Sequence, residues 1–104
     1  MAANEANRLE LQDILEGICD HVYFSPPESM HLKYPCIVYE RTNSMATFSD
    51  NMPYNVATRY TLTVIDEDPD SEILSKVEIL PMCTHDRTFL TDNLNHDVYT
   101  LFYK

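Results

Sequence analysis

Apolar residues recur at helical spacing near the start of the chain. They lie three or four positions apart, which places their side chains on one face of an α-helix, while acidic residues lie mostly on the opposite face. The pattern predicts an amphipathic helix over about residues 4–20, and Gly17 within it indicates close packing against a strand or an early helix end. The apolar positions are Leu11, Ile14, Leu15, Ile18 and Val22.

Two strands are predicted next. Residues 24–35 contain paired prolines and a Tyr-Pro step, which disfavour a helix, so we interpret them as an extended surface crossing. Residues 36–41, CIVYER, are apolar on both faces at their start and predict a central strand. Beyond them Tyr60, Leu62 and Val64 alternate with other residues on one face, which predicts a second strand with a core side.

A second helix and two more strands are predicted in the last third. Apolar residues between 73 and 80 follow helical spacing, and Pro81 ends that helix. Residues 83–90 and 96–104 predict strands on either side of a turn at 91–95. The order α-β-β-α-β-β predicts an α+β fold, in which a sheet of about four strands is covered by two helices.

One long connection interrupts this order. Residues 42–55, TNSMATFSDNMPYN, are polar and aperiodic and predict a mobile loop within a single domain of residues 1–104. Because long loops in small domains frequently carry function, we expect this one to contact another protein. Its candidate contact residues are Thr47, Phe48, Asp50, Asn51 and Tyr54.

Five acids fall within residues 66–72, which raises the question of a metal site. Alternate aspartates match the first positions of a calcium loop, but that loop also needs a glycine and a glutamate where Ser71 and Val77 stand. A helix start explains the run better, because Asp68 is a good N-cap and Pro69 falls at the first helical position. We therefore expect the second helix to begin there, without a metal.

The charge balance excludes several classes of function. Seven basic and seventeen acidic residues give a formal net charge of −10, and nucleic-acid binding needs basic side chains against the phosphates. DNA is therefore expected to pass such a surface without specific binding. The single glycine, Gly17, excludes phosphate-cradling loops, dinucleotide motifs and nucleophile elbows, which need several. No apolar run approaches the ~18 residues of a membrane span, and no secretory signal is visible.

Cysteine and histidine could supply chemistry in two ways. The pairs Cys19–His21 and Cys83–His85 offer four possible zinc ligands, but their spacing is not that of the tight knuckles in structural zinc sites. A Cys–His nucleophile pair is disfavoured because acidic surroundings raise the pKa of a thiol. We interpret the three cysteines as reduced, buried thiols and expect no catalytic residue, cofactor or metal.

The last strand is apolar on both faces. Tyr99, Leu101 and Tyr103 share one face, while Val98 and Phe102 share the other. If two helices cover one face, the other needs the long loop or a partner protein, and protein interfaces favour tyrosine and phenylalanine over charge. Tyr99, Leu101 and Tyr103 are therefore further candidate interface residues, with a place in the core as the alternative.

Four segments, which together cover most of the chain, carry a resemblance to a known family. They are RLELQDILEGI, VYFSPPESMHLKYPCIVYE, RYTLTVIDEDPDSEI and KVEILPMCTHDRTFLTDNLNHDVYTLFY, and the most specific part spans residues 68–99. The chain resembles the small structural proteins of long-tailed bacteriophages that are described as tail-completion, tail-terminator or minor capsid proteins.

The resemblance implies a structural virion protein without enzymatic activity, assembled in the host cytoplasm. Copies of such proteins close into a ring, typically of six, which caps the tail tube and joins it to the neck connector, or stopper, at the head–tail junction. The implied partners are further copies, the tail tube protein and the connector, and we expect residues 42–55 to contact the tube or the adjoining neck ring. The alternatives are another junction layer (stopper or adaptor), a minor capsid protein, a host-derived adaptor domain or, from a different class, a small enzyme or metal-binding module.

Overall fold

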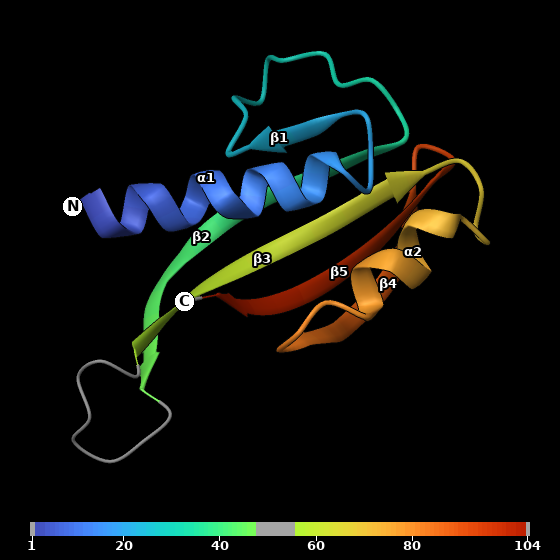
Figure 1. Ribbon diagram of the computed structural model, residues 1–104. Helices are drawn as coiled ribbons and strands as arrows, with labels where there is room; N and C mark the ends of the chain where they lie inside the picture. Colours follow the sequence, from blue (N-terminus) through green and yellow to red (C-terminus); the bar gives the residue numbers. More distant parts are fainter. Residues whose placement is uncertain (1, 48–55, 104) are drawn as a thin grey trace.

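The computed structural model describes residues 2–47 and 56–103, with side chains described over 8–42 and 58–103. Within these residues the chain forms two helices and five strands (Figure 1). In chain order they are α1 (Ala2–Glu16), β1 (Val22–Phe24), β2 (Cys36–Thr47), β3 (Val56–Asp66), α2 (Glu72–Glu78), β4 (Cys83–Thr91) and β5 (Leu94–Tyr103).

The strands form one mixed sheet in the order β1-β2-β3-β5-β4. β1 runs parallel to β2, and every other neighbouring pair is antiparallel. The α+β class and the single domain agree with the prediction, but the predicted four strands and their order are wrong because β1 was missed. Val22, assigned to the helical stripe, lies in β1 opposite Ile37. A strand of three residues is too short to show a period, and its parallel partner is distant in the sequence.

Helix α1 ends at Glu16, four residues earlier than predicted. The Gly17 N–H donates to the Asp13 carbonyl at 3.1 Å, and the N–H of Cys19 donates to the Leu15 carbonyl at 2.9 Å, which closes the last turn. A Cβ on Gly17 would meet only the carbonyl oxygens of Ile14 at 3.4 Å and of Asp13 at 3.7 Å. Gly17 therefore marks an early helix end, the second of the two predicted alternatives, and not a close contact with a strand.

The hydrophobic core lies between the helices and one face of the sheet. Three tyrosines of the central strands, Tyr39, Tyr60 and Tyr99, are at most 1% exposed. Two of them keep their hydroxyls satisfied, because Tyr39 donates to Gln12 of α1 and Tyr99 donates to a carboxylate oxygen of Glu78 in α2, the latter at 3.0 Å. The other core residues are Leu11, Leu15, Cys19, Ile37, Leu62, Val64, Val77 and Leu101.

Helix α2 begins three residues later than predicted. Its N-cap is Ser71, whose Oγ accepts a hydrogen bond from the Ile73 N–H at 3.2 Å. Asp68 and Pro69 are therefore not the helix start. The Asp66 carboxylate accepts from the Asp68 N–H at 3.0 Å, and the Asp68 carboxylate accepts from the Asp70 N–H at 2.9 Å. Aspartate is as common in such local turns as at helix N-caps. The carboxylates of Asp66 and Asp68 therefore stabilise a turn that precedes the helix.

The predicted loop 42–55 is partly strand. β2 continues to Thr47 and β3 begins at Val56, and these two residues are paired opposite each other. A register shift between Arg41 and Met45 precedes this pairing. The prediction of a loop is therefore wrong for 42–47, because pairing with β3 overrides a polar composition. Residues 48–55 lie outside the described residues.

A turn lies within the predicted range 91–95, but it consists of two residues, because β4 extends to Thr91 and β5 begins at Leu94. Thr91 and Leu94 are paired, and between them Asp92 and Asn93 adopt φ values of 53° and 63°. Two positive φ angles are required in the type I′ turn of a two-residue hairpin, and aspartate and asparagine tolerate them better than most residues. Neither helix in the described part of the chain (Figure 1) is both long enough and apolar enough to span a membrane.

Candidate functional site

The three thiols are held in their protonated form. Burial raises the pKa of Cys36 to about 12 and that of Cys83 to about 11, and it also raises the pKa of Cys19. Cys19 donates to the carbonyl oxygens of His21 and Pro35, each at 3.5 Å. A nucleophilic cysteine needs the opposite environment, one that lowers the thiol pKa. No group of three or more metal-ligating side chains occurs within the described residues.

One polar cluster joins β4 to β5, and the sequence analysis missed it. His85 Nε2 lies 3.0 Å from Thr88 Oγ1 and 3.2 Å from Asp97 Oδ1, and the Thr88 hydroxyl donates to Asp97 at 2.6 Å. Asp97 is only 8% exposed. In a nucleophilic triad the hydroxyl and the carboxylate contact different ring nitrogens, whereas here both contact the same one. The cluster therefore provides hydrogen bonds to the buried carboxylate of Asp97. Its members come together through the pairing of β4 with β5 and not through their spacing in the sequence.

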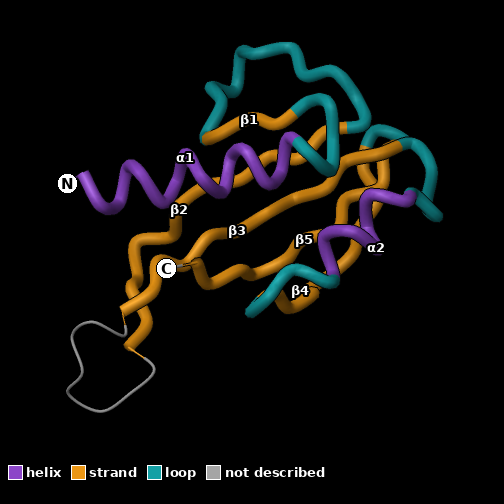
Figure 2. Tube along the Cα trace, in the orientation of Figure 1, coloured by secondary structure: helices purple, strands orange, loops and turns teal. Residues whose placement is uncertain are grey.

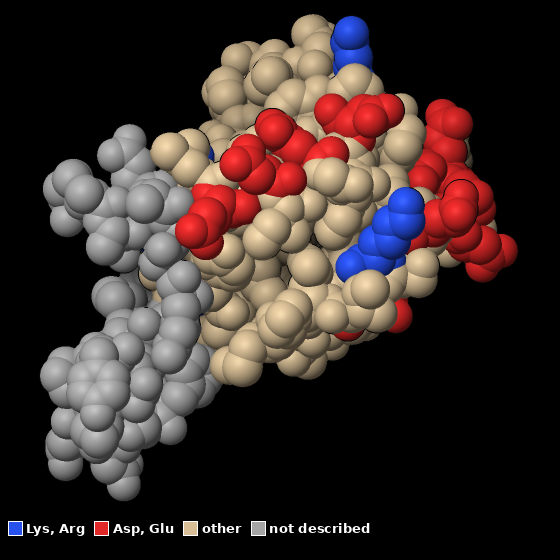
Figure 3. All heavy atoms as spheres, viewed as in Figure 1, with Lys and Arg blue, Asp and Glu red and all other residues tan. Residues whose placement is uncertain are grey.

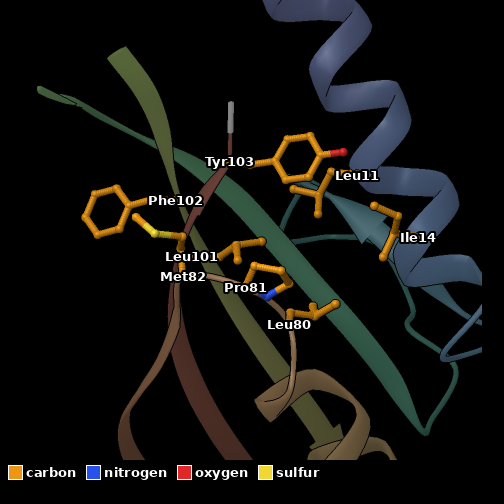
Figure 4. Close-up of a pocket in the computed structure, with 8 residues that line it drawn as sticks. All are labelled: Leu11, Ile14, Leu80, Pro81, Met82, Leu101, Phe102 and Tyr103. Carbon is orange, nitrogen blue, oxygen red and sulfur yellow. The ribbon is translucent and has the colours of Figure 1, made fainter. Parts of the chain in front are cut away.

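A shallow apolar groove lies between α1 and the connection from α2 to β4 (Figure 4). Its volume is about 270 Å³, and the Tyr103 hydroxyl at its border donates to Glu10 of α1 at 2.8 Å. Burial and this hydrogen bond raise the pKa of Tyr103 to about 12. The lining is otherwise aliphatic, aromatic or thioether, so the groove suits an apolar side chain and offers little to a polar substrate. It is lined by Leu11, Ile14, Leu80, Pro81, Met82, Leu101, Phe102 and Tyr103.

The opposite face of the sheet, here called the open face, is covered by neither helix. Figure 1 and Figure 2 show α1 and α2 on the same side of the sheet, and the core residues of both helices pack on that side. Strand register places Thr61, Thr63 and Thr100 on the open face, where each is half-buried. Ile65 and Val98 on the same face are 7% and 3% exposed. The open face is therefore a threonine-rich surface with apolar residues inside it.

Acidic side chains dominate the helical side of the molecule. Figure 3 shows them along α1 and around the connection between β3 and α2. On α1, Glu10, Asp13 and Glu16 are exposed, and the last turn of the helix carries no basic residue. This distribution repels phosphate and other anions over that side, as the net charge of −10 predicts.

The predicted interface residues fall into three groups. Tyr99 and Leu101 are 0% and 1% exposed and belong to the core, so their prediction as interface residues is wrong. They face the helices, and alternation alone does not tell which face of a doubly apolar strand is covered. Tyr103 is half-buried beside the groove and remains available. The backbone of Thr47 lies in β2, and the other predicted contacts, Phe48, Asp50, Asn51 and Tyr54, lie outside the described residues.

Three surfaces therefore remain as candidates: the groove, the open face and the acidic side along α1. Comparison of the chain with protein-family models, with curated proteins and with solved structures finds no match.

Proposed function

We propose that the protein is a structural component of a long-tailed bacteriophage, which forms a ring at the head–tail junction and acts without catalysis. The proposal begins from the resemblance of its sequence to tail-completion and tail-terminator proteins. The structural observation that supports it best is the open face, because a sheet with both helices on one side leaves a broad surface for an assembly contact.

The composition of the open face suits such a contact. Thr61, Thr63 and Thr100 present methyl and hydroxyl groups together, and Val38 and Phe102 on the same face are half-buried. An antiparallel sheet can also expose one face to water, and such a face is normally polar. Glu40 and Arg59 lie on this face, and Asp86 and Arg87 lie at its β4 edge. The middle positions, Thr61, Thr63 and Thr100, are uncharged, which resembles the depletion of charge in the centre of protein interfaces.

A closed ring needs two different surfaces on each copy, because neighbours in a ring meet head to tail. The groove and the open face meet this requirement, since the groove lies mainly on the helical side of the sheet and the open face on the other, with Phe102 at the border between them. An apolar side chain on the open face of one copy would then occupy the groove of the next, and the rest of the open face would meet the tube or the adjoining ring.

The acidic side along α1 fits the passage of DNA through such a ring. Glu10, Asp13 and Glu16 would repel the phosphate backbone if they faced the channel. A channel that bound DNA would slow its passage, whereas a repulsive wall leaves it free to move. In this proposal the negative charge of the protein keeps DNA from binding to the wall of the channel.

Removal of the gene from the phage tests the proposal and separates it from its nearest alternative. Loss of a tail terminator should give over-long tails that do not join heads, as seen by negative-stain electron microscopy. Loss of a stopper or adaptor would instead give tails of normal length and filled heads that leak DNA. Complementation with the wild-type gene is the control, and normal, joined particles in its absence would refute both versions.

A further inference from the structure

Strand β4 forms an edge of the sheet that no other described strand covers. It has nine residues, and β5 is its only neighbour in the sheet. All residues of β4 except the first are exposed, including Phe89 at 40% and Leu90 at 65%. The strand contains neither proline nor lysine, two residues that commonly block such edges, and the protecting features it does have are a bulge and the charges of Asp86 and Arg87.

The other edge is not comparable. β1 has only three residues, and Figure 2 shows the segment 25–35 passing outside it. The Lys33 N–H in that segment donates to the Tyr23 hydroxyl at 3.2 Å, which holds the segment against the strand. Of the two edges, only β4 therefore offers a long row of backbone donors and acceptors.

The charges of β4 are complementary to those of a second β4 running antiparallel. If a two-fold axis passes between Asp86 and Arg87, each of these residues lies opposite the other type in the second copy. The same register places His85 opposite Thr88. It also places Thr84 opposite Phe89 and Cys83 opposite Leu90, which brings the two exposed apolar residues onto uncharged partners.

The bulge in β4 makes this register consistent with the faces of the sheet. In a regular strand His85 and Thr88 would point to opposite faces, and a two-fold axis normal to the sheet could not pair them. The register shift between His85 and Arg87 changes this, because His85 and Thr88 both contact Asp97. On the other face, Asp86 accepts from the Thr100 hydroxyl at 2.5 Å and Arg87 lies opposite Val98. Each residue and its counterpart therefore share one face.

We propose that the free protein forms a two-fold dimer through β4, which joins two sheets into one of ten strands, five from each copy. Two copies with a net charge of −10 each repel one another over most of their surface. The β4 edge is where this repulsion is offset, because two reciprocal Asp86–Arg87 pairs form at its centre. The acidic helix α1 packs near β1, at the far edge of the sheet. A two-fold contact closes at two copies, so it covers the edge without building open chains.

Charge reversal in a mixing experiment tests the pairing. Asp86→Lys leaves only positive charge at the centre of β4, and Arg87→Glu leaves only negative charge. Each variant alone should dimerise at least about tenfold more weakly than the wild type, because like charges then oppose each other. An equimolar mixture of the two should form a heterodimer with close to wild-type affinity. Sedimentation equilibrium measures all three, and the dimer mass is twice 12.1 kDa.

Two controls separate the pairing from misfolding and from general charge. Asp13→Lys makes the same charge change on the exposed side of α1 and should leave dimerisation unchanged. Thermal unfolding followed by circular dichroism checks that each variant is folded, and the recovery of dimer in the mixture is itself evidence of two folded partners.

A wild-type protein that stays monomeric up to millimolar concentration would overturn the inference, as would single variants that dimerise like the wild type. Failure of the mixture to restore the dimer would also overturn it. The inference is independent of the proposed ring, whose neighbours meet head to tail, so none of these results bears on the loss of tail-length control. A six-copy species in solution would support the ring and contradict the dimer.

Discussion

Alkaline unfolding is expected to depend on the buried thiol of Cys36. This side chain is 0% exposed, and burial raises its pKa from 9.0 to about 12. Because the folded pKa is the higher one, the unfolded chain loses its proton first as the pH rises. The stability gained from keeping the thiol neutral is complete below pH 9 and is lost progressively between about pH 9 and 12.

The size of the effect follows from the shift in the pKa. At about pH 10, one unit above the unfolded value, ionisation of the unfolded thiol lowers the free energy of unfolding by about 1.4 kcal/mol. The full shift corresponds to about 4 kcal/mol by about pH 12. For a domain whose total stability is on the order of 5–15 kcal/mol, either loss is readily measured.

The Cys36→Ala variant removes the titrating group and should be compared with the wild type by urea denaturation from about pH 7 to 10.5. At neutral pH the variant should be less stable by about 1 kcal/mol, since it leaves a small cavity. As the pH rises the wild type should lose this advantage, so the two stabilities converge near pH 10. Parallel pH dependences would contradict the assignment of Cys36 as a buried neutral thiol.

Three further predictions concern the helix cap, the core and the open face. Ser71→Ala should lower the free energy of unfolding by about 1 kcal/mol because it removes the N-cap of α2, and Asp68→Ala, measured by the same denaturation, should cost less. Leu101→Ala should cost about 2–5 kcal/mol as a core truncation, and a cost below 1 kcal/mol would place this residue at a surface. Thr63→Lys on the open face should leave thermal unfolding within a few degrees of the wild type but should prevent complementation of the phage, whereas full complementation would exclude that position from the assembly contact.

The elements with a strong period were predictable from the sequence. Tyr60, Leu62 and Val64 alternate over the length of β3, and all three are buried against the helices. Of the stripe predicted for α1, Leu11 and Leu15 are buried, while Ile14 is 40% exposed and Ile18 and Val22 lie beyond the end of the helix. Such patterns are local, because burial on one face of an element imposes its own period on the residues of that element.

Features that depend on contacts between distant segments were not predictable in this way. β1 forms because Val22 pairs with Ile37, although a proline-rich segment separates them in the sequence. β2 extends through polar residues because β3 pairs with it. His85 and Asp97 meet through the bulged pairing of β4 with β5. The cap at Ser71 was missed for a different reason, since Asp68 and Ser71 are both good N-caps and only the intervening turn decides between them.

Candidate surfaces were the least predictable part. The sequence indicated that one face of β5 would need cover, and the structure leaves the face that carries Val98 and Phe102 uncovered by either helix. Which apolar residues belong to the core depends on where the helices dock, so Tyr99 and Leu101 were misassigned to an interface while the groove beside Tyr103 was not foreseen.

The central claim is that the chain is a protein of the phage head–tail junction, and cryo-electron microscopy of the virion proposed to contain it tests this claim most directly. The account predicts a ring of copies between the neck connector and the last ring of the tail tube, with the open face against a neighbouring protein and the acidic side of α1 toward the channel. Density for the chain elsewhere in the particle, or a particle that lacks it, would contradict the account.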